Sequence, residues 1–145
     1  MLISPLFKEA VEQSYSANYI IHMRFSDTLI RGRFIRRYKR FLTDIELENG
    51  EVVVAHCANS GSMLSINDPG SEVWISPAQN PERKLRYTWE IIRIGRTLVG
   101  VNTSRPNAIA ADAVRKGKIP ELKEYDIINR EVKYGKNSRI DLLLK

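Results

Sequence analysis

The feature that most constrains the fold is a period-2 alternation that runs up to an Asn-Gly pair and resumes after it. In FLTDIEL (41–47), Phe41, Thr43, Ile45 and Leu47 fall on one face of an extended chain, which predicts a half-buried strand. ENGE (48–51) follows, and Asn-Gly between two such runs predicts a tight hairpin whose two central residues need positive φ. VVVAHC (52–57) is then expected to pair back as the next strand.

Further short strands with turn signals between them continue this pattern. Residues 67–71 (NDPGS) contain Pro-Gly turn chemistry, and the Gly95-Arg96 pair is expected to turn the chain between two strands. Five strands are expected, over residues 31–47, 52–57, 72–76, 85–94 and 97–103. No long helix interrupts them, so we predict a mostly β chain in which residues 24–103 form a five-stranded barrel of the oligonucleotide-binding (OB) type.

The pattern changes after residue 103. Ser104 or Thr103 is expected to cap a helix, Pro106 suits its first turn and Gly117 suits its end. An apolar stripe is formed by Ile109, Ala110, Ala113 and Val114. Residues 127–134 and 139–145 then predict a β-hairpin around the turn GKNS. Because a helix and one hairpin bury little apolar surface, residues 104–145 are expected to be the incomplete start of a second α+β domain.

The remaining N-terminal segment, residues 1–23, is expected to be an extension that forms a marginal helix or an arm. No apolar run in the chain approaches the roughly 20 residues that span a bilayer. A single cysteine, Cys57, excludes an intramolecular disulfide and favours the reducing cytoplasm.

The net charge of +6 is concentrated in one short stretch. Residues 24–40 contain seven basic residues and one acidic residue, whereas the rest of the chain has sixteen of each. A localised positive field attracts polyanions, and nucleic acid is the commonest such partner in a cell. The alternative is a solvated basic strand edge that discourages aggregation between sheets.

Aromatic side chains lie among these cations. In an extended strand Arg31, Arg33 and Arg37 would point one way and Arg36 and Arg40 the other, unless a bulge intervenes. Arginines bind phosphates, and rings such as Phe34 and Tyr38 either stack on bases or pack the barrel. The segment PERKLRYTW (81–89) repeats the combination. The predicted nucleic-acid contacts are Arg31, Arg33, Arg36, Arg37, Tyr38, Lys39, Arg40, Arg83, Lys84 and Arg86.

Other polar residues give weaker signals. His56 and Cys57 do not have the spacing of a metal site, because the only other histidine is His22 and there is no second cysteine. The loop 58–63 could present backbone N–H groups to a phosphate, or could simply turn a barrel corner. Asp141 lies among aliphatic residues and is expected to have either Arg139 or a metal ion as its partner.

Several segments together resemble one protein family. RFIRRYKRFLTDIEL, AHCANSGSM, NPERKLRYTWE, LVGVNTSRPN, IPEL and EVKYGKNSRIDLLL occur in an order and spacing similar to the bacterial sugar fermentation stimulation protein family, SfsA. The resemblance runs from about Met23 to the last residue. It implies an OB barrel followed by a domain with the PD-(D/E)xK nuclease fold, and a DNA-binding role linked to sugar metabolism.

The resemblance is incomplete in the second domain. The nuclease pattern needs an Asp, here Asp141, and then a Glu-x-Lys on a following strand, which this chain does not contain. No catalytic residue and no cofactor are therefore expected in this chain, and Asp141 is only the remnant of a metal site. A full-length relative could use Mg²⁺.

We therefore expect a DNA-binding protein of the SfsA type that contacts the phosphate backbone through its basic barrel. The alternative is a Mg²⁺-dependent nuclease in full-length form, inactive in this chain. A barrel that binds RNA or another protein is a third possibility, since the charge pattern alone does not separate these partners.

Overall fold

The computed structural model describes Phe25 and residues 28–145. The described residues form two compact units, one that ends at Thr103 and a second that comprises Ser104–Lys145. The predicted extension 1–23, together with His22 and Arg24, lies outside the described residues.

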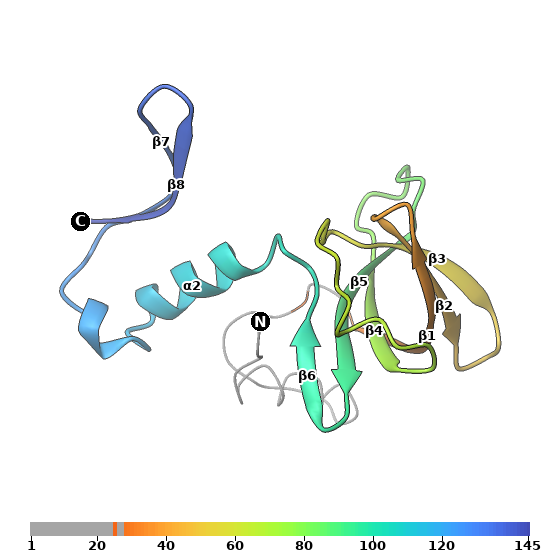
Figure 1. Ribbon diagram of the computed structural model, residues 1–145. Coiled ribbons are helices and arrows are strands. Elements are labelled where there is room, and N and C mark those ends of the chain that lie inside the picture. The colour runs from red at the N-terminus through yellow and green to blue at the C-terminus, as the bar shows by residue number, and fades with distance from the viewer. Residues whose placement is uncertain (1–24, 26–27) are drawn as a thin grey trace. The chain divides into compact units, whose positions relative to one another are not determined.

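Six strands make up the first unit: β1 (Ile30–Tyr38), β2 (Leu42–Leu47), β3 (Val52–His56), β4 (Glu72–Pro77), β5 (Tyr87–Ile94) and β6 (Thr97–Gly100). They are arranged in the order β3-β2-β1-β4-β5-β6, and a parallel pairing of β3 with β5 closes the first five into a barrel (Figure 1). β6 pairs with the C-terminal half of β5 and extends the sheet beyond the closure. The predicted mostly β fold with a five-stranded barrel is thus confirmed.

The five strands that form the barrel are not the five segments that the sequence predicted. Residues 31–47 are not one strand but two antiparallel strands, β1 and β2, joined by a turn at residues 39–41. Lys39 and Arg40 have φ of 49° and 64°, a region that non-glycine residues seldom adopt. Because this turn contains no Gly, Pro, Asn or Asp, nothing local in the sequence signals it.

The predicted hairpin between β2 and β3 exists, but with a different turn. The N–H of Gly50 donates to the carbonyl of Leu47 at 2.9 Å, and the N–H of Leu47 donates to the carbonyl of Glu51 at 2.8 Å. Only Gly50 has positive φ, at 82°, whereas the side chain of Asn49 accepts from the N–H of Glu51. The loop therefore has three residues rather than two, as in a type I turn followed by a left-handed glycine.

The inward faces of the five barrel strands form one core. Phe34 and Trp89 stack at its centre, with ring centroids 5.2 Å apart, and Ile45, Val53 and Ile75 pack around them. A second cluster on the outer side of β4 and β5 contains Leu29, Trp74, Ile91 and Leu98. Phe41, which the alternation assigned to the core face, is instead half exposed in the turn before β2.

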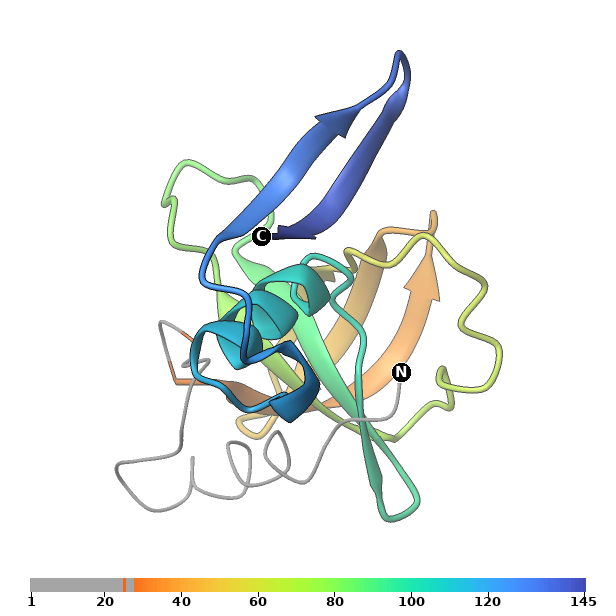
Figure 2. The same cartoon turned by 90° about the vertical axis from the view of Figure 1, so that its left-hand side faces the viewer.

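The second unit consists of α2 (Pro106–Arg115), a short 3-10 helix (Pro120–Leu122) and a hairpin of β7 (Ile128–Tyr134) and β8 (Ser138–Leu144), against which α2 packs (Figure 2). The helix begins with Pro106 as expected, but Arg105 occupies the cap position. Thr103, predicted as a possible cap, donates to the carbonyl of Ala58 instead. No helix in the described part of the chain is long and apolar enough to span a membrane.

Candidate nucleic-acid interface

A bulge in β1 determines where its arginines point. Gly32 and Phe34 are buried inside the barrel, and the register with β2 shifts between Phe34 and Arg36. The extra residue places Arg36 opposite Asp44, so that Arg36 shares the outer face with Arg31 and Arg33. This differs from regular alternation, which would put Arg36 on the face opposite to Arg31 and Arg33.

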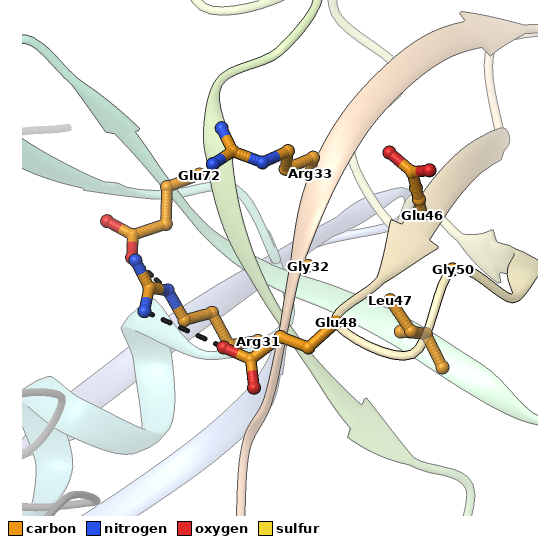
Figure 3. Close-up of a pocket in the computed structure, with 8 residues that line it drawn as sticks. All are labelled: Arg31, Gly32, Arg33, Glu46, Leu47, Glu48, Gly50 and Glu72. Atoms are coloured by element: carbon orange, nitrogen blue, oxygen red, sulfur yellow. Dashed lines mark ion pairs between the residues drawn. The ribbon is translucent and has the colours of Figure 1, made fainter.

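The outer face of β2 and the turn that follows it place one carboxylate near each arginine of this row, which consists of Arg31, Arg33 and Arg36. Asp44 and Glu46 lie opposite Arg36 and Arg33, and Glu48 follows β2. Nη1 of Arg31 is 3.6 Å from Glu48, and Nε of Arg31 contacts the carboxylate of Glu72 on β4. Figure 3 shows Arg31 between these two glutamates, at the edge of a hollow of about 320 Å³.

Asp44 is bonded to two side chains of β1, Arg36 and Tyr38. Its carboxylate accepts from Nε of Arg36 at 2.7 Å and from the hydroxyl of Tyr38 at 3.0 Å, and only 8% of the residue is exposed. The hydrogen bond to Asp44 raises the pKa of Arg36, and the same carboxylate raises the pKa of the Tyr38 phenol. The predicted contacts Arg36 and Tyr38 are therefore already engaged by a carboxylate.

Pairing thus offsets the charge of two of the four arginines in β1, Arg31 and Arg36. Arg33 donates weakly to the carbonyl of Gly70, at 3.4 Å, and lies between Glu46 on β2 and Glu72 on β4. The expected continuous cationic surface along the first strand is in fact an alternation of arginines and carboxylates. The physical reason is the register of the two strands, which pairs acidic residues of β2 with arginines of β1.

Arg37 points away from this row and connects two loops. Its guanidinium donates to the carbonyl of Arg40 at 2.5 Å and 3.0 Å, to that of Asn59 at 2.7 Å and to that of Ser62 at 3.5 Å. These bonds hold the turn 39–41 against the loop that follows β3. In that loop the N–H of Gly61 is bonded to the side chain of Asn59, so this amide is not available for a phosphate.

The other predicted cations lie in two loops that border the end of β3. The first is the turn 39–41, with Lys39 and Arg40, and the second is the β4–β5 loop, with Arg83, Lys84 and Arg86. Among residues 28–145, no carboxylate lies within ion-pair distance of the four cations other than Arg83. Nη1 of Arg83 donates to the hydroxyl of Thr88 at 2.9 Å.

The register brings these two loops to opposite sides of His56. Leu42, the residue after the first loop, pairs with His56, and His56 pairs with Thr88, which follows the second loop. Adjacent strands are about 4.8 Å apart, so roughly 10 Å separates β2 and β5, the strands on either side of β3 at His56. We name the arrangement the loop frame: residues 39–41 and 83–86 on either side of His56.

β3 has a largely apolar outer face that begins at His56, inside the loop frame, and extends to Val52, roughly 13 Å along the strand and opposite Glu46. Val52, Val54 and His56 point outward from β3, since Val53 and Ala55 between them are buried. Val52 is 56% exposed and Val54 is 37% exposed. Nothing in the sequence marks Val52 and Val54 as site residues, because a run of valines is equally typical of a buried strand. Phe41 is not marked either, because the alternation assigns it to the core face.

The two weak metal signals find little support. In the part of the chain that the structure describes, no three residues of the types His, Cys, Asp and Glu are grouped as metal ligands. Cys57 is buried, with its Sγ 3.7 Å from the sulfur of Met63. Asp141 is exposed rather than buried, and Arg139, its expected partner, pairs with Glu131 at 2.7 Å.

Two family models match the chain. Residues 35–101 match the SfsA N-terminal OB domain, and residues 104–145 match the sugar fermentation stimulation protein RE domain. A sugar fermentation stimulation protein homolog of Rhodospirillum rubrum is 58% identical over 123 residues, which are 85% of this chain and 50% of that protein. A homolog of Paramagnetospirillum magneticum is 57% identical over 123 residues, again 85% of this chain and 52% of that protein.

The chain spans about half the length of the curated relatives it matches. A similar fold occurs in the structure of Pyrococcus furiosus SfsA in complex with Ca²⁺. The TM-score is 0.73 at 24% sequence identity, over 88% of this chain and 53% of that one.

Proposed function

The chain belongs to the sugar fermentation stimulation protein family, SfsA, and we propose that its barrel binds DNA through the cationic loop frame. The frame, rather than the arginine row of β1, supplies the phosphate contacts. In OB barrels generally, the face of the second and third strands and the loops beside it bind oligonucleotides. The frame occupies the equivalent position here.

The observation that carries this proposal is the contrast between paired and unpaired cations. Arg31 and Arg36 each contact a carboxylate, so their charge is largely cancelled before any ligand arrives. Lys39, Arg40, Lys84 and Arg86 form no ion pair among the described residues, and the one acid in their two loops, Glu82, is not within ion-pair distance of them. A polyanion therefore gains more by approaching the frame than by approaching β1.

Binding of this kind is sequence-independent and depends strongly on salt. If three to five phosphates are neutralised, the plot of log K against log salt has a slope of about −2.5 to −4.5. We propose that the protein acts in the cytoplasm and that the DNA it binds controls genes of sugar metabolism. This would explain why the family name refers to sugar fermentation.

The test is a pair of charge reversals measured by fluorescence anisotropy with labelled DNA. Lys84→Glu with Arg86→Glu reverses two frame cations and is expected to abolish measurable binding at physiological salt. Arg96→Glu is the matched control for Lys84→Glu alone, because each reverses one charge and Arg96 is in the β5–β6 turn, at the opposite end of β5, roughly 25 Å away. Equal losses of affinity in Lys84→Glu and Arg96→Glu would overturn the proposal.

The nuclease alternative is a property we propose only for longer relatives, in which Mg²⁺ would be held by further ligands. The residues described here do not fit a metal ion, since Asp141 is exposed and no ligand group of three surrounds it. Incubation of this chain with DNA and Mg²⁺ is expected to give no cleavage. Cleavage that Asp141→Asn abolishes would contradict that expectation.

A further inference from the structure

We infer that the ligand of the loop frame is single-stranded nucleic acid, whose unpaired bases lie on the apolar surface of β3. This inference rests on the proposed function and adds the class of ligand to it. It depends on what lies between the cations rather than on the cations themselves.

The outer surface of β3 that adjoins the frame is suited to bases and not to a phosphate backbone. Val54 offers an exposed aliphatic side chain one outward position from His56, and the acid beside it, Asp44, is covered by Arg36 and Tyr38. Val52 lies one outward position further along, opposite the exposed Glu46, so the apolar part of the surface is centred on Val54. A duplex keeps its base faces stacked inside and presents phosphates and sugars, which gain nothing from aliphatic groups. Unpaired bases expose their faces, and burying them against valines removes apolar surface from water on both sides.

Two rings are placed where a base could stack. His56 lies in the middle of the row that joins the two loops, and its side chain is partly exposed. Phe41 is 50% exposed, and it directly follows Lys39 and Arg40 in the first loop. In a single strand each phosphate is followed by a base. Lys39, which could bind a phosphate, is likewise followed two residues later by the ring of Phe41, which could stack on a base.

Phe41 is also held in this position rather than left to move with a flexible turn. Its carbonyl accepts from the N–H of Cys57 at 2.8 Å, and Arg37 fixes the carbonyl of the preceding residue, Arg40. Folding the chain so that a phenyl ring stays half in water brings no hydrophobic stabilisation from the exposed half. A stacking contact with a ligand would use that exposed surface.

The experiment compares four ligands with the full 145-residue chain at one salt concentration. The ligands are a single-stranded DNA of roughly 12 nucleotides, which lies within the range one OB fold covers, the RNA of the same sequence, and the two corresponding duplexes. The wild-type protein is expected to bind the single strands at least tenfold more tightly than the duplexes. The RNA and DNA arms show whether the sugar matters.

Two variants then test the rings. Phe41→Ala and His56→Ala are each expected to weaken single-strand binding about 5- to 150-fold, the equivalent of about 1–3 kcal/mol for one stacked base, with little change for duplexes. Tyr134→Ala is the matched control, since it removes an exposed ring from β7 in the second unit. Thermal unfolding confirms that each variant is folded.

The outcomes separate this inference from the proposed function. Equal affinity for single strands and duplexes, with a steep salt dependence and no effect of Phe41→Ala or His56→Ala, would overturn the inference and leave DNA binding by the frame intact. Absence of binding to all four ligands would overturn both.

Discussion

Replacing Arg37 by alanine should destabilise the barrel rather than remove a phosphate contact. The side chain holds three loop carbonyls, and the bond to Asn59, at 2.7 Å, is partly buried. A hydrogen bond from a charged donor contributes about 1.5–3 kcal/mol, and the exposed bonds to Arg40 contribute less because water competes for them. We therefore expect a loss of about 2–3 kcal/mol in the free energy of unfolding.

Such a loss is easily measured by thermal or urea unfolding. For a domain of roughly 60–100 residues, each kcal/mol shifts Tm by about 4–8 °C, so a fall of about 10–20 °C is expected. Arg37→Lys keeps the charge but cannot donate to three carbonyls from a planar fork, and should lose most of the same stability. Arg96→Ala, an exposed arginine in the β5–β6 turn, is the control and should leave Tm nearly unchanged.

Binding measurements on the same variant separate the two possible roles of Arg37. At a temperature where Arg37→Ala is folded, the slope of log K against log salt should equal that of the wild type. Unchanged stability, together with a slope that is smaller by about 0.7–0.9, would show that Arg37 is a phosphate contact and that the structural role is wrong.

Three further predictions concern the barrel itself. Gly32→Ala should destabilise it by about 1–3 kcal/mol, because the new Cβ would lie 2.6 Å from Cγ2 of Ile45 and 2.7 Å from the carbonyl oxygen of Glu46; an unchanged urea midpoint would contradict this. Thr43→Val should stabilise it by about 1 kcal/mol, since the Thr43 hydroxyl is buried and has no hydrogen-bond partner among the described residues; a loss of stability would refute that account. The raised pKa of Tyr38 means that the folded state holds this proton more tightly than the unfolded state does. The stability difference between the wild type and Tyr38→Phe should therefore be constant below pH of about 10 and shrink as pH rises above it, and a difference that grows in that range would be inconsistent with the hydrogen bond to Asp44.

Strands whose boundaries are set by local chemistry could be predicted from the sequence. The turn at Gly95 and the hairpin of residues 128–144 occur where the sequence places them, because glycine supplies the left-handed backbone that such turns need. The Asn49-Gly50 hairpin was located correctly, although its turn type was not. Alternation between these signals was enough to indicate a barrel.

The break between β1 and β2 could not be predicted in this way. Lys39 and Arg40 adopt left-handed φ only because the guanidinium of Arg37 and the loop after β3 hold the turn, and these contacts exist only in the folded barrel. Phe41 was assigned to the core for the same reason, since alternation was continued across a turn that the sequence does not mark.

Counting basic residues in the sequence also could not show which of them are available to bind a polyanion. The sequence shows how many cations a strand carries, but the register decides which of them face an acid. A single bulged residue in β1 moves Arg36 opposite Asp44, and this pairing is invisible until β1 and β2 are aligned. The loop cations, which looked less prominent in the sequence, keep their charge because no strand partner lies opposite them.

The most direct test of this account is the salt dependence of single-stranded DNA binding by two double variants that each remove two formal charges. Lys39→Ala with Lys84→Ala, in the loop frame, should reduce the magnitude of the slope of log K against log salt by about 1.4. Arg31→Ala with Arg36→Ala, in the paired row of β1, should leave the slope at the wild-type value. If the β1 variant loses the slope and the loop variant keeps it, the nucleic acid binds the arginine row and the central claim is wrong.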